Sequence, residues 1–168
     1  EIRNPWHPDD AKHYTTDRMR NDFLIQDLFI PDKVKLVYSH VDRIIVGGVC
    51  PSEKVLTLEA GHELGVDYFL ERRELGVINI GGPGTVILDG EEYDLYYKDG
   101  LYAGMGIKEV SFKSDDPANP AKFYLNSAPA HHTYPTLKIT MEMANKRPLG
   151  SVEGCNTVSY THLRAHET

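Results

Sequence analysis

Two short stretches of the sequence combine side chains that could bind or transform a small molecule. In the first, His40, Asp42 and Arg43 follow a β-prone run, and the planar guanidinium of Arg43 could bind a substrate carboxylate. The same three residues could instead form a buried polar network or a subunit contact, which we favour. If the first interpretation holds, His40 and Arg43 are the candidate substrate-binding residues.

The second stretch is the proline-flanked sequence PAHHTYP, which carries His131, His132 and Tyr134. Loops often carry functional residues, and imidazole and phenol groups can act as general acids and bases. The alternative is a packed linker to a following domain. His131 and Tyr134 are the candidate catalytic residues of this chain.

A third group, Glu71 to Glu74, mixes both signs of charge on a predicted strand. Alternation places Glu71 and Arg73 on one face of the strand and the other two on the opposite face. If Glu71 and Arg73 point inward, they should form a paired buried network, because a buried charge needs a partner. A role for Arg73 in binding a substrate carboxylate is the other interpretation.

Composition limits the partners of the protein. The chain has 168 residues, a net charge of −7, 40% hydrophobic residues and two cysteines. Because nucleic acids and anionic membranes bind basic patches, we expect neither as a partner. The cysteines lack metal-site or disulfide-framework spacing. No stretch reaches the length of a transmembrane helix, so we expect a cytoplasmic protein.

The elements that would position these residues are mostly strands. A short helix is predicted at 17–29, with Asp17 as its N-cap. Turn residues such as Asp89-Gly90 separate β-rich runs at 34–39, 43–49, 54–58, 67–72, 76–80, 85–89, 92–97, 109–113 and 122–127. Many short strands without a long helical period predict an all-β sandwich or barrel, with a hairpin turning at Asp89-Gly90.

The glycine spacing resembles that of the cupins, whose fold is a jelly-roll barrel. The frame runs from Gly65 to Gly84, but the metal-ligand positions of the cupin motifs hold Glu71, Arg73, Val77 and Glu109. A divalent ion prefers neutral imidazoles with a carboxylate, and an arginine among the ligands would repel it. We therefore expect a degenerate cupin barrel with no metal ligands.

Three longer stretches resemble the N-terminal half of the 5-keto-4-deoxyuronate isomerase family. They are YSHVDRIIVGGV at 38–49, YFLERRELGVINIGGPGTV at 68–86 and PAKFYLNSAPAHHTYPT at 120–136. The resemblance implies a double cupin of pectin breakdown that assembles as a hexamer. It also implies a zinc ion held by the second cupin, so no cofactor is expected in this part.

The last eleven residues, VSYTHLRAHET, match the translation of a common transposon-type sequencing adaptor. They contain His162, His166 and Glu167, a metal-like cluster that we therefore set aside. We expect an N-terminal segment at 1–33, a degenerate cupin barrel at 34–140, the start of an interdomain linker at 141–157, and disordered adaptor sequence at 158–168.

The resemblance implies that the parent protein is a ketol-isomerase acting on a small uronate, and we expect this part alone to be inactive. The alternative is a non-catalytic cupin domain that binds sugar or assembles oligomers. The degenerate positions Glu71, Arg73 and Glu109 favour that alternative for the domain taken by itself.

Overall fold

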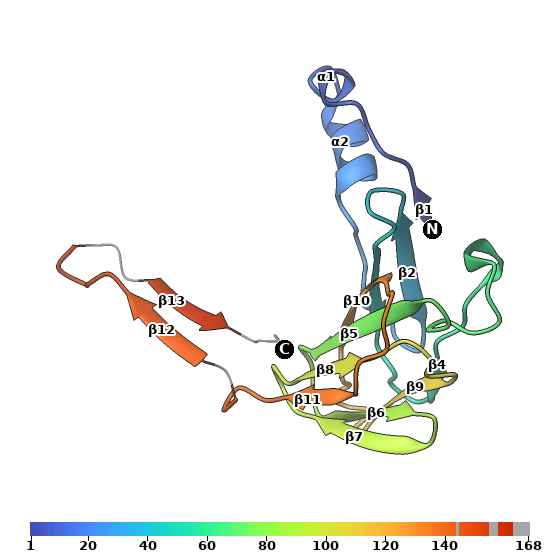
Figure 1. Cartoon of the computed structure of the whole chain (residues 1–168). Coiled ribbons are helices and arrows are strands. Elements are labelled where there is room, and N and C mark those ends of the chain that lie inside the picture. Colours follow the sequence, from blue (N-terminus) through green and yellow to red (C-terminus); the bar gives the residue numbers. More distant parts are fainter. Residues whose placement is uncertain (144, 155–157, 163–168) are drawn as a thin grey trace.

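Two sheets of mainly antiparallel strands form the body of the protein (Figure 1). This computed structural model describes residues 1–143, 145–154 and 158–162. The first sheet contains β1 (Ile2–Arg3), β2 (Val34–Ser39), β3 (Ile45–Val49), β10 (Phe123–Pro129), β5 (Arg73–Asn79), β8 (Gly100–Ala103) and β11 (Leu137–Ile139), in that spatial order. The second contains β4 (Leu56–Thr57), β9 (Val110–Ser114), β6 (Gly84–Leu88) and β7 (Glu91–Leu95). The predicted all-β, cupin-type jelly-roll sandwich is confirmed.

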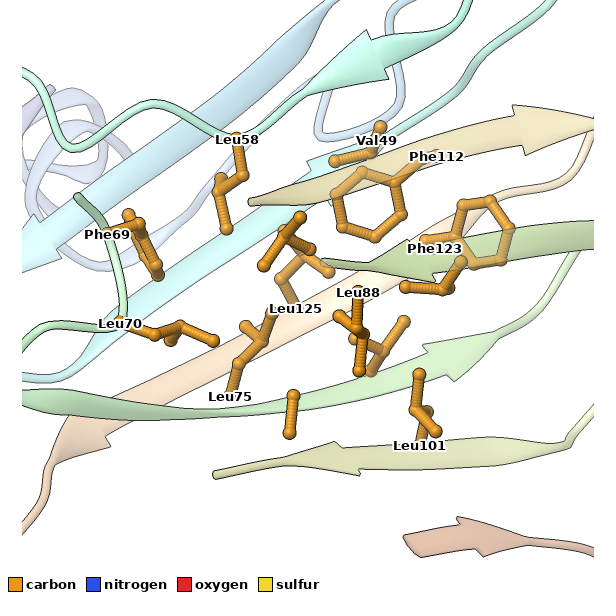
Figure 2. Packing of buried hydrophobic residues seen from close by; sticks show 14 of the residues in the cluster. Val49, Leu58, Phe69, Leu70, Leu75, Leu88, Leu101, Phe112, Phe123 and Leu125 are labelled. Carbon is orange, nitrogen blue, oxygen red and sulfur yellow. The ribbon is translucent and has the colours of Figure 1, made fainter. Parts of the chain in front are cut away.

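The space between the sheets is filled by apolar side chains (Figure 2). Alternate residues of β5 and β10 point into it, so Leu75, Val77, Phe123 and Leu125 are almost completely buried. The rings of Phe112 and Phe123 meet with their centroids 5.3 Å apart. Period-two alternation therefore gives β5 and β10 one dry face each.

The outward face of the four-stranded sheet is polar. Lys113 on β9 forms an ion pair with Glu92 on β7, with 2.8 Å between nitrogen and oxygen. The hydroxyl of Thr85 on β6 donates to the carboxylate of Asp94 on β7 at 3.0 Å. Such cross-strand polar pairs are typical of a sheet face in contact with water.

The outward face of the seven-stranded sheet is covered on β3 by the segment that leads into β2. A Cβ placed on Gly48 would lie 2.3 Å from the carbonyl oxygen of Leu28. Glycine is thus required at this position for the two backbones to approach each other.

The hairpin predicted at Asp89-Gly90 is confirmed. β6 pairs with β7 antiparallel, with Leu88 opposite Glu91. Asp89 and Gly90 have φ angles of 48° and 88°, which suits a two-residue turn of the type that matches strand twist.

The predicted strand at 67–72 is wrong. After the short 3₁₀ helix η1 (His62–Leu64), this segment forms turns, and β5 begins only at Arg73. Phe69 and Leu70 are adjacent and both buried, which a strand with one dry face does not allow.

The predicted N-terminal helix is real but shorter. Helix α1 (Pro8–Ala11) precedes α2 (Thr16–Phe23), and both stand beyond the β1 end of the sheet (Figure 1). Thr15, rather than Asp17, is the N-cap of α2, and its hydroxyl accepts from the Arg18 amide. The helix ends because the backbone of Leu24 is extended, and the chain continues towards the sheet.

The structure describes five residues of the C-terminal segment, for which the disorder stays a prediction. Val158–His162 form β13, which pairs antiparallel with β12 (Asn145–Leu149) in a hairpin apart from the sandwich (Figure 1). Alternating Val158 and Tyr160 favour an extended strand whatever the origin of the segment. His166 and Glu167 lie outside the described residues, and the adaptor origin of the segment stays a prediction.

None of the helices in the described part of the chain is long and apolar enough to cross a membrane.

Gly48→Ala should lower the free energy of unfolding by about 1–3 kcal/mol, because the new methyl group collides with the Leu28 backbone. The matched control is Gly76→Ala on β5, where the nearest atom to an added Cβ is 3.6 Å away. Urea unfolding of both variants measures the difference. Equal stability of the two variants would contradict the close approach at Gly48.

Candidate functional site

Among the predicted site residues, Arg73 has the most deeply buried side chain. It opens β5, lies on the same face as Leu75, and is only 6% exposed. Its Nε–H donates to the Ser127 hydroxyl at 3.1 Å, and one Nη donates to the Ser127 carbonyl at 2.9 Å and the Arg43 carbonyl at 2.6 Å. The guanidinium therefore joins β5, β10 and the turn between β2 and β3.

Ser127 extends this network to the next residue of β5. Its hydroxyl accepts from Arg73 and donates to the Glu74 carbonyl at 2.7 Å. The backbone of Arg43 is left-handed, with φ of 54°, and this conformation is part of the turn that offers its carbonyl to Arg73. The network thus uses the backbone of Arg43.

The side chains of the β2–β3 turn are exposed. Those of His40 and Arg43 reach solvent, and the His40 ring meets Tyr38 edge-on at 5.2 Å. The structure brings His40, Arg43 and Arg73 into one region, in which the two exposed side chains stay accessible to a ligand. The side chains of His40, Asp42 and Arg43 do not form the buried polar network favoured for them; the buried network in this region is built on Arg73 and Ser127.

Burial is the main influence on the ionisation of Arg73. It lowers the pKa of the guanidinium, the nearby Tyr38 acts in the opposite direction, and the positive charge of Arg43 lowers the pKa further. The ordinary pKa of arginine is so high that the group stays cationic near neutrality. Within the described part of the chain, no carboxylate forms an ion pair with Arg73, and carbonyl and hydroxyl oxygens solvate it instead.

The predicted buried pair of Glu71 with Arg73 is wrong. Glu71 precedes β5, where its carboxylate accepts from the Asp67 amide at 2.8 Å and lies 3.7 Å from the guanidinium of Arg72. The alternation argument failed because β5 begins at Arg73, so Glu71 has no place on its dry face.

A second polar group lies on the opposite, outward face of β5. The phenol of Tyr102 on β8 donates to the carboxylate of Glu74 at 2.7 Å. Burial raises the pKa of Tyr102 well above its usual value, and the hydrogen bond and charge of Glu74 raise it further. This pair could not be predicted from the sequence, since no local pattern relates residues so distant in the chain.

The loop that carries His131 and Tyr134 packs beside this second group. A Cβ on Gly104 would lie 2.1 Å from the Tyr134 carbonyl oxygen, so the loop rests against the chain that leaves β8. The side chains of His131 and Tyr134 are exposed, and the Tyr134 ring lies 6.4 Å from that of His132. These candidates therefore lie on the other face of β5 from Arg73.

The cupin metal positions of this barrel do not offer a suitable donor set. Val77 points into the apolar core, Glu71 lies in a turn, and Glu109 is exposed beside Ser111. Among the described residues, no group of three or more histidine, cysteine, aspartate or glutamate side chains could hold a metal ion. The residues at these positions do not fit a zinc ion in this barrel, and the family resemblance implies zinc only in the second cupin.

Comparisons with known proteins agree on one family. The sequence profile described as the KduI/IolB family matches residues 24–160. A protein of Lachnospira eligens is 60% identical over 160 residues, which cover 93% of this chain and 57% of that protein. One from Lachnoclostridium phytofermentans is 58% identical over 156 residues, which cover 93% and 56%. Both are named 4-deoxy-L-threo-5-hexosulose-uronate ketol-isomerase, and the chain spans about half of their length.

Among solved structures, the fold is similar to that of an IolB-like protein from Salmonella typhimurium. The TM-score is 0.50 at 13% identity, and the match covers 68% of this chain and 41% of that one. At this level of identity the likeness concerns the fold alone.

Arg73→Met should lower the free energy of unfolding by about 2–4 kcal/mol, because buried acceptors on Ser127 and Arg43 lose their donor. Arg72→Met is the matched control, since Arg72 is exposed and its change should stay within about 0.5 kcal/mol. Urea unfolding measures both. A fully stable Arg73→Met variant would show that Arg73 is not a structural link.

Proposed function

Because this chain belongs to the KduI/IolB family, we propose that it is the N-terminal part of a 4-deoxy-L-threo-5-hexosulose-uronate ketol-isomerase. The observation that carries the proposal is the identity of 58–60% to proteins of that name across 93% of the chain. The activity belongs to the whole protein, of which the chain corresponds to about half.

The proposed reaction converts the uronate to 3-deoxy-D-glycero-2,5-hexodiulosonate in the cytoplasm, during breakdown of pectin or other polyuronates. A ketol isomerisation moves a proton between adjacent carbons through an enediol or enediolate. It needs a base that is active near neutral pH and a group that stabilises the developing oxyanion. The base and the group that stabilises the oxyanion must both reach the substrate in a cleft. The apolar interior of this barrel does not supply such groups.

We assign the zinc ion to the other half of the protein. The donor set of this barrel does not fit a metal, because the inward positions of β5, β8 and β10 hold residues such as Val77, Leu101 and Leu125. In this proposal the division follows the domain plan, with the barrel at 34–140 and a linker from 141 onwards.

The part described here would supply a scaffold and one wall of the active-site cleft. Arg73 holds the β2–β3 turn, whose exposed His40 and Arg43 could bind the substrate carboxylate. His131 and Tyr134 are exposed on the loop beside β8 and could exchange protons with the substrate. The two groups flank opposite faces of β5, so in this proposal one of them lines that wall and the other forms an oligomer contact.

We further propose that the full-length protein is a homo-oligomer, a hexamer by family resemblance. The candidate side chains at His40, Arg43, His131 and Tyr134 are exposed in the single chain. Exposed candidates of this kind fit a cleft that is completed by another domain or subunit.

A non-catalytic sugar-binding or assembly domain is the second candidate function, and the apolar filling of the barrel favours it. The full reading frame discriminates between the two. A His-x-His…Glu…His pattern after Asn156 supports the isomerase, whereas a stop codon supports the non-catalytic domain.

The chain at 1–157 should not convert the keto-deoxyuronate even with added zinc, while the full-length protein should do so. The reason is that the described part offers no metal donor set. A coupled assay of product formation, with circular dichroism to verify folding of the short chain, provides the measurement. Robust turnover by the short chain would refute the division of labour between the halves.

In the full-length protein, Tyr134→Phe should lower kcat by about 10²-fold or more with little change in KM, if the phenol transfers a proton. Tyr97→Phe is the matched control, because Tyr97 is also exposed but lies in the β7–β8 turn. Steady-state kinetics on both variants gives the comparison. An unchanged kcat would leave Tyr134 as a packing residue of the loop.

A further inference from the structure

A groove of about 220 Å³ crosses the outward face of the seven-stranded sheet. The cross-strand pairs Gly76–Tyr102 and Ile78–Gly100 lie side by side on β5 and β8, so the two glycines stand on a diagonal. Their missing side chains open the groove between Ile78 and Tyr102. The lining includes Gly76, Ile78, Gly100, Tyr102, Tyr124 and Ile139, which we call the outer groove.

Nothing within the described chain requires the two glycines of the outer groove. A Cβ on Gly76 would meet nothing nearer than 3.6 Å, and one on Gly100 nothing nearer than 3.4 Å. Neither glycine has a positive φ angle. Glycine weakens a strand interior and often marks a place where another chain approaches closely. Gly48 is the internal comparison, because there the chain itself supplies the close contact.

The surroundings of the outer groove are mainly apolar, although they face outward and include Asn126 on β10. Ile78 is 40% exposed and Ile80, just beyond β5, is 45% exposed. On the other sheet the corresponding outward positions carry Lys113, Glu92 and Asp94, with Ile87 as an apolar exception. A sheet face that carries isoleucine and tyrosine in place of charged pairs is typical of a buried interface.

The length of the chain indicates what covers the groove. The chain spans 56–57% of its curated relatives, so those proteins contain a large part that is not represented here. β11 is the edge strand at this end of the sheet, and its Ile139 lines the groove. Residues that follow β11 therefore start beside the groove, and a tethered domain reaches it at a high effective concentration.

We propose that the outer groove is the docking surface for the second half of the full-length protein, which inserts an apolar side chain between Ile78 and Tyr102. This inference rests on the proposed function only in its assumption that the chain is one part of a longer isomerase. The hydrogen-bonded Glu74–Tyr102 pair lies at the end of the groove and provides a polar rim.

Thiol labelling tests the docking surface. Ile78→Cys is introduced into the 168-residue chain and into the full-length protein, and N-ethylmaleimide labelling of that peptide is followed by mass spectrometry. The full-length protein should label at least about tenfold more slowly than the short chain, because the second half covers the groove. Glu92→Cys on the polar outward face is the matched control and should label equally in both proteins.

Two results would overturn the proposal. Equal, fast labelling of Ile78→Cys in both proteins would show an uncovered face. Slow labelling in both, accelerated by dilution of the short chain, would show that a second copy covers the groove instead. Isomerase activity is measured separately, so protection of Ile78→Cys without turnover would refute the proposed function and leave the docking surface intact.

Discussion

The dry space between the two sheets is the constraint on which the rest of the structure depends. Inward residues such as Leu75, Val77, Phe112 and Leu125 fill most of it with hydrocarbon and aromatic rings. Protein interiors are close-packed, so a side chain of another type enters only where its polar atoms find partners. Polar chemistry in this domain is therefore confined to the ends of the strands and to the outward faces.

Arg73 shows how a charged side chain can lie at the edge of the apolar core when oxygen atoms accept its hydrogen bonds. The guanidinium lies at the end of β5 where the core meets the β2–β3 turn, and its Nε and one Nη donate to Ser127 and to the Arg43 carbonyl. A buried cation on β5 that is solvated by oxygens of two other segments, β10 and the β2–β3 turn, fixes all three relative to one another. The adjacent residue, Glu74, points the other way and pairs with Tyr102. One step along a strand thus separates a structural cation from a partly buried acid–phenol pair on the opposite face.

Local patterns predicted the fold well and the contacts poorly. Alternation gave most strands, and Asp89-Gly90 gave the hairpin, because both signals act between neighbouring residues. The strand expected at 67–72 failed because Phe69 and Leu70 are both buried in a turn, which depends on distant partners. The role of Arg73 was equally hidden, since its acceptors lie on β10 and on the backbone of Arg43, far away in sequence.

The outward faces of the two sheets differ in polarity, and this difference concerns the contacts of the domain with a neighbour. Lys113 and Glu92 satisfy each other in water, so that face is complete in the chain as it stands. Ile78 and the glycines beside it gain nothing from water, and the glycines weaken their strands without easing any contact in the chain. Such residues are consistent with the fold only if the face is covered. The barrel therefore has an apolar interior without catalytic groups, and its outward face beside Ile78 suits contact with a neighbouring domain.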